Sequence, residues 1–216
     1  MGLSIHYSGN LKNANLLTNL IEEVQDVAKA HGWKYHIFET FFPNNKFDVK
    51  SGFDEIYGIS FTPTDCETIS ITFLANGVMV CPSTMYFFTN SITKQKREFI
   101  YTISVKTQYA GVKVHQFIIL FFKYLEGKYF SNFKLFDESG YWETNDEEKM
   151  KTQFENYTAL LDNFALAMET FPVQKDENII VYFERLMKQI TDLEIVKFHC
   201  SFFCVVYCSV IQVVVL

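Results

Sequence analysis

The 216-residue sequence predicts an α+β domain with a mainly antiparallel sheet, and three observations support this fold class. The chain opens with a strand-helix-strand pattern, in which short apolar-polar alternations flank an amphipathic helix. Short β-rich runs then surround Asn76-Gly77, a dipeptide that suits the positive φ angles of a tight hairpin. A later helix has an apolar stripe wide enough to cover a sheet. We therefore expect an N-terminal strand-helix-strand unit, with the helices packed on the sheet.

The opening unit is expected to contain strands at 3–7 and 33–37, with a helix at 13–31 between them. Apolar residues recur in the helix every three or four positions and acidic residues lie between them, which is typical of a helix with one buried face. Gly32 follows the last turn and is the residue type that most often ends a helix. In the second strand, apolar and polar side chains alternate as on a half-buried strand.

Further strands and helices follow the opening unit. The strands are expected at 57–61, 69–73, 78–80, 84–88, 99–109 and 133–136. The helices are expected at 112–129, 145–168 and 178–190. Thr144 and Glu147 have the spacing of a capping box and predict the start of the second of these helices.

The length favours a single core, so we expect one domain over residues 1–194 and an apolar tail over 195–216. The helix over 112–129 should be the most buried. Its stripe includes Phe117, Phe121 and Phe122, which should lie against the sheet.

Composition excludes two broad classes. Hydrophobic residues make up 49% of the chain and charged residues 20%, so the chain is too apolar to remain disordered. The formal charge is −6 and there is no long Lys/Arg cluster, which argues against a nucleic-acid partner. Cys66 and Cys81 are the only cysteines before the tail, and their spacing fits neither a disulfide framework nor a zinc site. The first ten residues lack the pattern of a signal peptide, so we expect a cytoplasmic protein. The sequence contains no P-loop, dinucleotide fingerprint or HExxH stretch, so we expect no metal or cofactor.

The tail leaves three alternatives open. Residues 198–216 contain no charged residue, and as a helix these 19 residues would span about 28 Å, close to the thickness of a bilayer core. The tail could therefore be a membrane anchor. Its Val and Phe content suits a segment packed on the core equally well. The third alternative is an accidental extension of a domain that ends near Leu193.

Three segments are candidates for chemistry. The first is the acidic turn around Asp65-Cys66-Glu67, which also suits an ordinary turn between strands. In the second, Lys106 and Gln108 would share a strand face ahead of Gly111 and His115, where a helix N-terminus could receive an anion. The structural alternative is that Lys106 is a solvated strand residue and His115 a capped or partly buried one.

The third segment runs from Asp137 to Glu143 and places carboxylates around a glycine and two aromatics. Tyr141 and Trp142 could grip a ligand or could anchor the loop to the core. We therefore predict a ligand site formed by Lys106, Gln108, His115, Tyr141, Trp142 and Glu143.

The three segments also resemble shared blocks of a bacterial α+β family that has no assigned biochemical role. The similar residues are Gly58-Ile59-Ser60 leading to Asp65-Cys66-Glu67, Val105-Lys106-Thr107-Gln108 with Ala110-Gly111 and His115, and Asp137-Glu138 with Gly140-Tyr141-Trp142-Glu143-Thr144. The resemblance covers roughly residues 3–170 and implies a bacterial cytoplasmic protein. It implies no reaction, substrate or cofactor, and the apolar tail is not part of the pattern.

Two functions remain in competition at this point. The acidic charge, the aromatic loop and the lack of a familiar catalytic motif favour a non-catalytic domain that binds a protein or a small anionic ligand. The alternative is a small metal-assisted hydrolase built on Cys66, Glu67, His115, Glu138 and Glu143. The second function requires these side chains to come within hydrogen-bond reach of one another.

Overall fold

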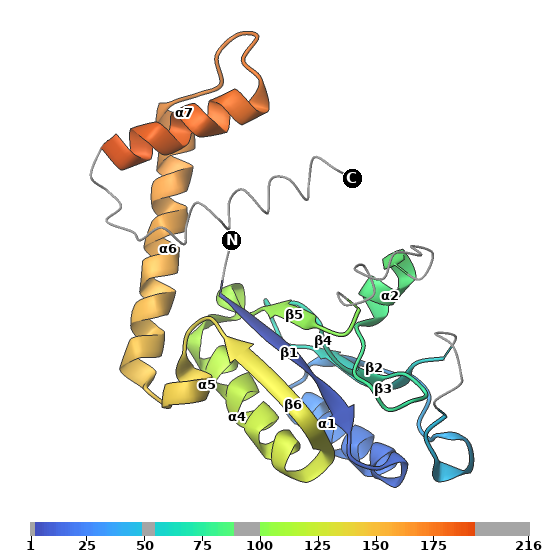
Figure 1. The fold of residues 1–216 in the computed structure, drawn as a ribbon. Coiled ribbons are helices and arrows are strands. Elements are labelled where there is room, and N and C mark those ends of the chain that lie inside the picture. Colours follow the sequence, from blue (N-terminus) through green and yellow to red (C-terminus); the bar gives the residue numbers. More distant parts are fainter. Residues whose placement is uncertain (1–2, 49–54, 89–99, 193–216) are drawn as a thin grey trace. The chain divides into compact units, whose positions relative to one another are not determined.

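The computed structural model describes residues 3–48, 55–88 and 100–192 (Figure 1). It confirms the α+β class, because the described residues form helices and two antiparallel three-stranded sheets. The N-terminal strand-helix-strand unit is present as predicted. The chain divides into two compact units, one over Gly2–Lys151 and one from Thr152 onward.

The first sheet has the N-terminal strand at its centre. Its strands, in spatial order, are β5 (Ile103–Lys106), β1 (Ser4–Leu11) and β6 (Phe130–Asp137). The antiparallel register places His6 opposite Ser104 on one side and opposite Phe136 on the other. Alternation along β1 sends Ile5 and Tyr7 into the core and His6 to the other face.

The second sheet lies beside the first within the same unit. Its strands, in order, are β2 (Lys34–Ile37), β3 (Tyr57–Thr62) and β4 (Ile69–Phe73). Residues 78–80, which we expected to be a strand, form only isolated bridges. They link the two sheets, because Met79 N–H donates to Gly9 O (2.8 Å) and Val80 N–H donates to Thr72 O (3.0 Å).

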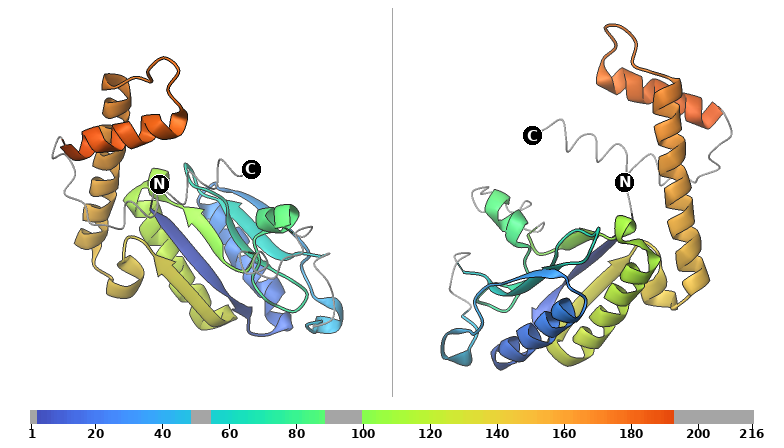
Figure 2. Two further views of the ribbon diagram at one scale, coloured as in Figure 1. Left: turned by 45° about the horizontal axis from the view of Figure 1, so that its top comes forward. Right: turned by 180° about the vertical axis from the view of Figure 1, so that it is seen from behind.

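Two helices cover one face of these sheets (Figures 1 and 2). They are α1 (Leu17–Ala30), preceded by the short helix η1 (Ala14–Leu16), and α4 (Gly111–Tyr129). Phe121 and Phe122 of α4 are buried, as predicted. Phe117 is only half-buried and packs edge-on against Trp33, with ring centroids 5.6 Å apart. The opposite face of the sheets carries polar side chains from alternate strand positions, including Ser60, Ser70, Ser104 and His6.

The strand predicted at 84–88 is wrong, because Pro82–Phe88 forms the helix α2. Pro82 occupies the first helical position, where its fixed φ angle suits the helix and its missing N–H costs nothing. Met85 N–H donates to Cys81 O (3.0 Å) and closes the first turn.

The strand predicted at 99–109 is too long. Only Ile103–Lys106 forms β5, and the chain then turns into the short helix η3 (Gln108–Ala110). The turn begins at Thr107. Its N–H donates to the carbonyl oxygen of Leu3 (3.0 Å), the residue just before β1. Lys106 and Gln108 therefore do not share a strand face.

The predicted capping box at Thr144 is also wrong. Tyr141–Thr144 forms the short helix α5, and the long helix α6 begins at Glu147 and extends to Thr170. Asp146 caps α6, since its Oδ1 accepts from Lys149 N–H (3.0 Å). Thr144 instead accepts from Asp146 N–H (3.2 Å), which places the cap two residues later than predicted.

The second unit contains most of α6 and the helix α7 (Ile179–Asp192). Its small core consists of Ala167, Tyr182 and Leu186, with partly buried aromatics around them. Arg185 of α7 holds the loop that precedes this helix, because its guanidinium donates two hydrogen bonds of 2.8 Å to Glu177. In the described ranges, no helix is both long and apolar enough to cross a membrane. The predicted tail lies outside these ranges.

Candidate functional site

The three sequence segments converge at the N-terminal end of β1. Thr107 from the second segment donates its N–H to Leu3 O (3.0 Å). Glu138 from the third segment donates its N–H to Ser4 O (3.2 Å), and its Oε2 accepts from Ser4 N–H (2.8 Å). The second and third segments therefore meet at the start of β1, through hydrogen bonds with Leu3 and Ser4.

The acidic turn joins the same region through Lys106. Lys106 N–H donates to Glu67 Oε2 (2.8 Å), and Glu67 N–H donates to Lys106 O (3.3 Å). The thiol of Cys66 lies 3.4 Å from the same carbonyl oxygen. Glu67 thus supplies the hydrogen-bond acceptor that a neighbouring strand would otherwise provide to β5.

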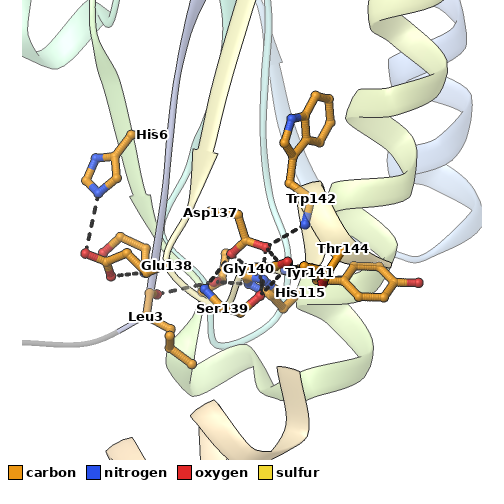
Figure 3. Close-up of polar contacts among 12 residues, drawn as sticks. Leu3, His6, His115, Asp137, Glu138, Ser139, Gly140, Tyr141, Trp142 and Thr144 are labelled. Atoms are coloured by element: carbon orange, nitrogen blue, oxygen red, sulfur yellow. Dashed lines mark hydrogen bonds and ion pairs between the residues drawn. The ribbon is translucent and has the colours of Figure 1, made fainter. Parts of the chain in front are cut away.

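His115 lies in the first turns of α4 and is completely buried. Its Nε2 lies 3.0 Å from Asp137 Oδ1 (Figure 3). Its Nδ1 lies 2.6 Å from Thr107 Oγ1. Ser139 Oγ is a further neighbour of Nε2, at 3.0 Å. Both ring nitrogens are therefore committed to buried protein groups.

Asp137 organises the loop that follows β6. Its carboxylate accepts from the N–H groups of Ser139 (2.9 Å), Tyr141 (2.9 Å) and Trp142 (3.1 Å), and from the Ser139 hydroxyl (2.7 Å) (Figure 3). Burial raises the pKa of Asp137, but hydrogen bonds and charge from His115 and hydrogen bonds from Ser139 outweigh burial and lower the pKa to about 2. The aspartate is therefore an ionised structural group at neutral pH.

The aromatic pair of the third segment is anchored to the first unit. Tyr141 is buried, and its hydroxyl accepts from Gln116 Nε2 (3.0 Å). The Trp142 ring meets Phe133 edge-on and has Lys123 Nζ 5.4 Å from its centroid. Glu143 is exposed on α5. Anchoring explains both aromatics without a ligand.

Of the remaining predicted ligand-site residues, Lys106 is exposed whereas Gln108 and His115 are buried. The buried Gln108 Oε1 has no hydrogen-bond partner among the described residues. Lys106 lines a pocket of about 390 Å³ together with Asp65, Cys66, Glu67 and Tyr109. Tyr109 falls within the strand predicted at 99–109, but the turn into η3 places it outside β5 and leaves it 68% exposed at this pocket.

A second pocket of about 470 Å³ opens on the polar face of the sheets. Hydroxyl groups from both sheets and the start of α2 contribute to its wall, and Glu67 lines both pockets. The lining residues are Phe38, Ser60, Glu67, Thr68, Ser70, Cys81, Pro82, Ser83, Ile103 and Ser104. Sequence reasoning did not select this face, although outward polar residues on alternating strands are the signal that could have indicated it.

Four of the five side chains proposed for a metal-assisted hydrolase, all except the exposed Glu143, make other contacts. Burial raises the pKa of the Cys66 thiol to about 12, and the charge of Glu67 adds to this effect. Cys66 is therefore neither an ionised nucleophile nor a ready metal ligand at neutral pH. His115 is enclosed, and Glu67 and Glu138 each accept a backbone N–H. Within the described ranges, no group of three or more potential metal-ligating side chains is present.

No protein family, curated protein or solved structure matches this chain. The function of the candidate site must therefore be inferred from the contacts within this chain.

Proposed function

We propose that the protein is a binding domain that takes a zwitterionic, peptide-like ligand in the 390 Å³ pocket beside Lys106. The observation that supports this function best is the combination of groups around the pocket: one ammonium, two carboxylates and one exposed phenol ring. Among the described residues, neither the Lys106 ammonium nor the Asp65 carboxylate has a hydrogen-bond or ion-pair partner. These charges are available to a ligand.

The groups beneath the pocket support a preformed site. Lys106 and Glu67 are held together by two hydrogen bonds, and the next residue, Thr107, is fully buried and donates its N–H to Leu3 O. A ligand would therefore meet a floor whose polar groups are already ordered. Preorganisation of this kind reduces the entropy that binding would cost.

The charges define the ligand class. A ligand carboxylate would pair with Lys106, and a ligand ammonium would pair with Asp65 or Glu67. An apolar portion of the ligand would contact the Tyr109 ring. A purely dianionic ligand would be repelled by the two carboxylates, which narrows the anionic ligand expected from sequence to one that also carries a positive charge.

The test is an NMR titration of the ¹⁵N-labelled full chain with the dipeptide Lys-Glu and, separately, with inorganic phosphate. We expect the dipeptide to shift the amide signals of residues 65–67 and 106–109. Lys106→Ala should weaken binding at least about tenfold without unfolding the protein, because an exposed strand lysine contributes little to stability. Lys134→Ala is the matched control, since Lys134 is an exposed lysine on β6 outside the pocket.

Each outcome has a clear meaning. Equal shifts with phosphate would reject the zwitterionic class and leave a simple anion site. The absence of shifts with both compounds would contradict the proposed pocket. A large loss of stability in Lys106→Ala with unchanged binding would assign Lys106 a structural role.

A further inference from the structure

Three polar side chains from distant parts of the sequence line up on the polar face of the first sheet. Ser104 of β5 and His6 of β1 are directly paired across the strands, and Ser104 Oγ lies 2.7 Å from His6 Nδ1. On the other side of the ring, His6 Nε2 lies 3.7 Å from Glu138 Oε1 (Figure 3). The order of groups is hydroxyl, imidazole and carboxylate.

The His6 imidazole and the Glu138 carboxylate are each held in place by a further contact. Glu138 Oε2 accepts from Ser4 N–H (2.8 Å), which leaves Oε1 directed toward His6. The His6 ring stacks on Phe136, with centroids 6.0 Å apart and an angle of 26° between the ring planes. These contacts restrict the rotation of His6 beside Ser104.

The buried group Thr107-His115-Asp137 provides an internal comparison. It has the same chemical order, but Thr107 and His115 are inaccessible and the Thr107 hydroxyl also lies 3.3 Å from Leu3 O. Ser104, in contrast, is exposed and lines the 470 Å³ pocket. Of these two groups, only the one containing Ser104 can meet a substrate.

We propose that Ser104 is a nucleophile for acyl transfer, with His6 as its general base and Glu138 as a positioning residue. Ser104 and His6 lie within the hydrogen-bond distance that a nucleophile and its base require, and the Glu138 carboxylate, 3.7 Å from the ring, is close enough to attract the imidazole when it carries the proton. The substrate class is a small ester, whose acyl group would enter the pocket between Ser104 and Phe38. This inference goes beyond the proposed binding function and does not depend on Lys106.

The chemical step is a balanced substitution at the ester carbonyl. Ser104 Oγ bonds to the carbonyl carbon while its proton moves to His6 Nδ1. The bond to the alkoxy group then breaks, and His6 returns the proton to the departing alcohol. Water deprotonated by His6 next attacks the acyl-serine, which releases the carboxylic acid and restores the Ser104 hydroxyl.

The test uses a fluorophosphonate probe on the full chain, with peptide mass spectrometry to locate the adduct. We expect an adduct at Ser104 and none there in Ser104→Ala. His6→Asn should slow labelling about a hundredfold, which is the usual scale of general-base catalysis. Ser8→Ala is the matched control, because Ser8 lies on the same strand as His6, and it should label at the wild-type rate.

Glu138→Gln tests positioning separately from structure. The variant keeps an oxygen acceptor for Ser4 N–H but loses the charge beside His6. It should melt near the wild-type temperature yet change the pH dependence of the labelling rate. A folded wild-type protein without an adduct at Ser104, or an unchanged rate in His6→Asn, would overturn the inference. Neither result would bear on the dipeptide titration, which reports a different pocket.

Discussion

His115 Nε2 and Asp137 Oδ1 lie 3.0 Å apart, and both side chains are wholly inaccessible to solvent. This pair joins the start of α4 to the end of β6, and the Asp137 carboxylate also orders the loop that leads into α5. A histidine that appears functional in the sequence is therefore part of the connection between two elements of the fold.

Asp137→Ala should be strongly destabilising. The substitution leaves His115 buried without its carboxylate and removes the acceptor for several backbone N–H groups, so we expect a loss of about 3–5 kcal/mol in the free energy of unfolding. Urea denaturation measures the loss. Asp146→Ala, which removes an exposed helix cap, should cost only about 1 kcal/mol. Similar losses in the two variants would contradict the role assigned to Asp137.

The lowered pKa of Asp137 predicts a specific acid sensitivity. Its folded value of about 2 lies below the ordinary 3.8, so Asp137 contributes its stabilisation fully above about pH 4 and loses it as the pH falls toward 2. The contribution is about 2 kcal/mol. Unfolding free energies of the wild type and Asp137→Asn should therefore converge between pH 4 and 2. A constant difference across that range would show that the carboxylate charge is not responsible.

The two described cysteines should differ in reactivity. Burial raises the pKa of both thiols, but hydrogen bonds from Ser83 and Thr84 outweigh burial at Cys81 and lower its pKa, whereas the Cys66 pKa rises to about 12. At neutral pH, iodoacetamide should alkylate Cys81 at least about tenfold faster. Peptide mapping separates these products from those of the tail cysteines. Ser83→Ala should slow the reaction at Cys81, and equal rates at the two positions would refute the prediction.

Gly58 of β3 should not tolerate a side chain. Its φ angle is +118°, and a Cβ atom built there would lie 2.3 Å from the backbone oxygen of Ile71 in the paired strand β4. Gly58→Ala should therefore cost more than about 1 kcal/mol. Thermal melts can compare it with Gly127→Ala, where φ is not positive and the added atom meets nothing within 4 Å. A smaller loss at Gly58 than at Gly127 would show that the sheet relaxes easily.

The alternatives for the tail can be separated by truncation after Glu194. Removal of a membrane anchor should release a folded protein from the membrane fraction. Removal of a packed segment should lower the melting temperature or cause aggregation, because each buried Phe or Val contributes about 1.5–3 kcal/mol. An unchanged melt of the truncated protein, together with a soluble monomeric full-length protein, would favour an accidental extension.

The sequence predicted most of the scaffold because the long elements have clear periodicity. The helix at 112–129 was identified within one residue of α4, and the strands at 57–61 and 69–73 match β3 and β4 closely. The error at 84–88 arose because a short run without a clear period fits a strand as well as a helix. In that case, Pro82 was the decisive local signal.

The site was harder to predict because its contacts are not local. No spacing rule relates His115 to Asp137, or His6 to Ser104, since strand order and register decide both pairs. The sequence drew attention to polar residues in loops and at helix starts. Several of these proved to hold the backbone together, whereas exposed Tyr109 and Ser104 had appeared to be ordinary strand residues.

The central position of β1 determines when the first sheet can assemble during synthesis. Strand β1 is synthesised before both of its neighbours and must wait for them, because Ser4 pairs with Lys106 and Ile5 pairs with Asp137. The helix α1 and strands β2, β3 and β4 are complete by Phe73 and can associate earlier. Until β6 appears, the nascent chain therefore carries an apolar strand without its final partners, which makes this interval the one in which newly made chains most need protection from aggregation.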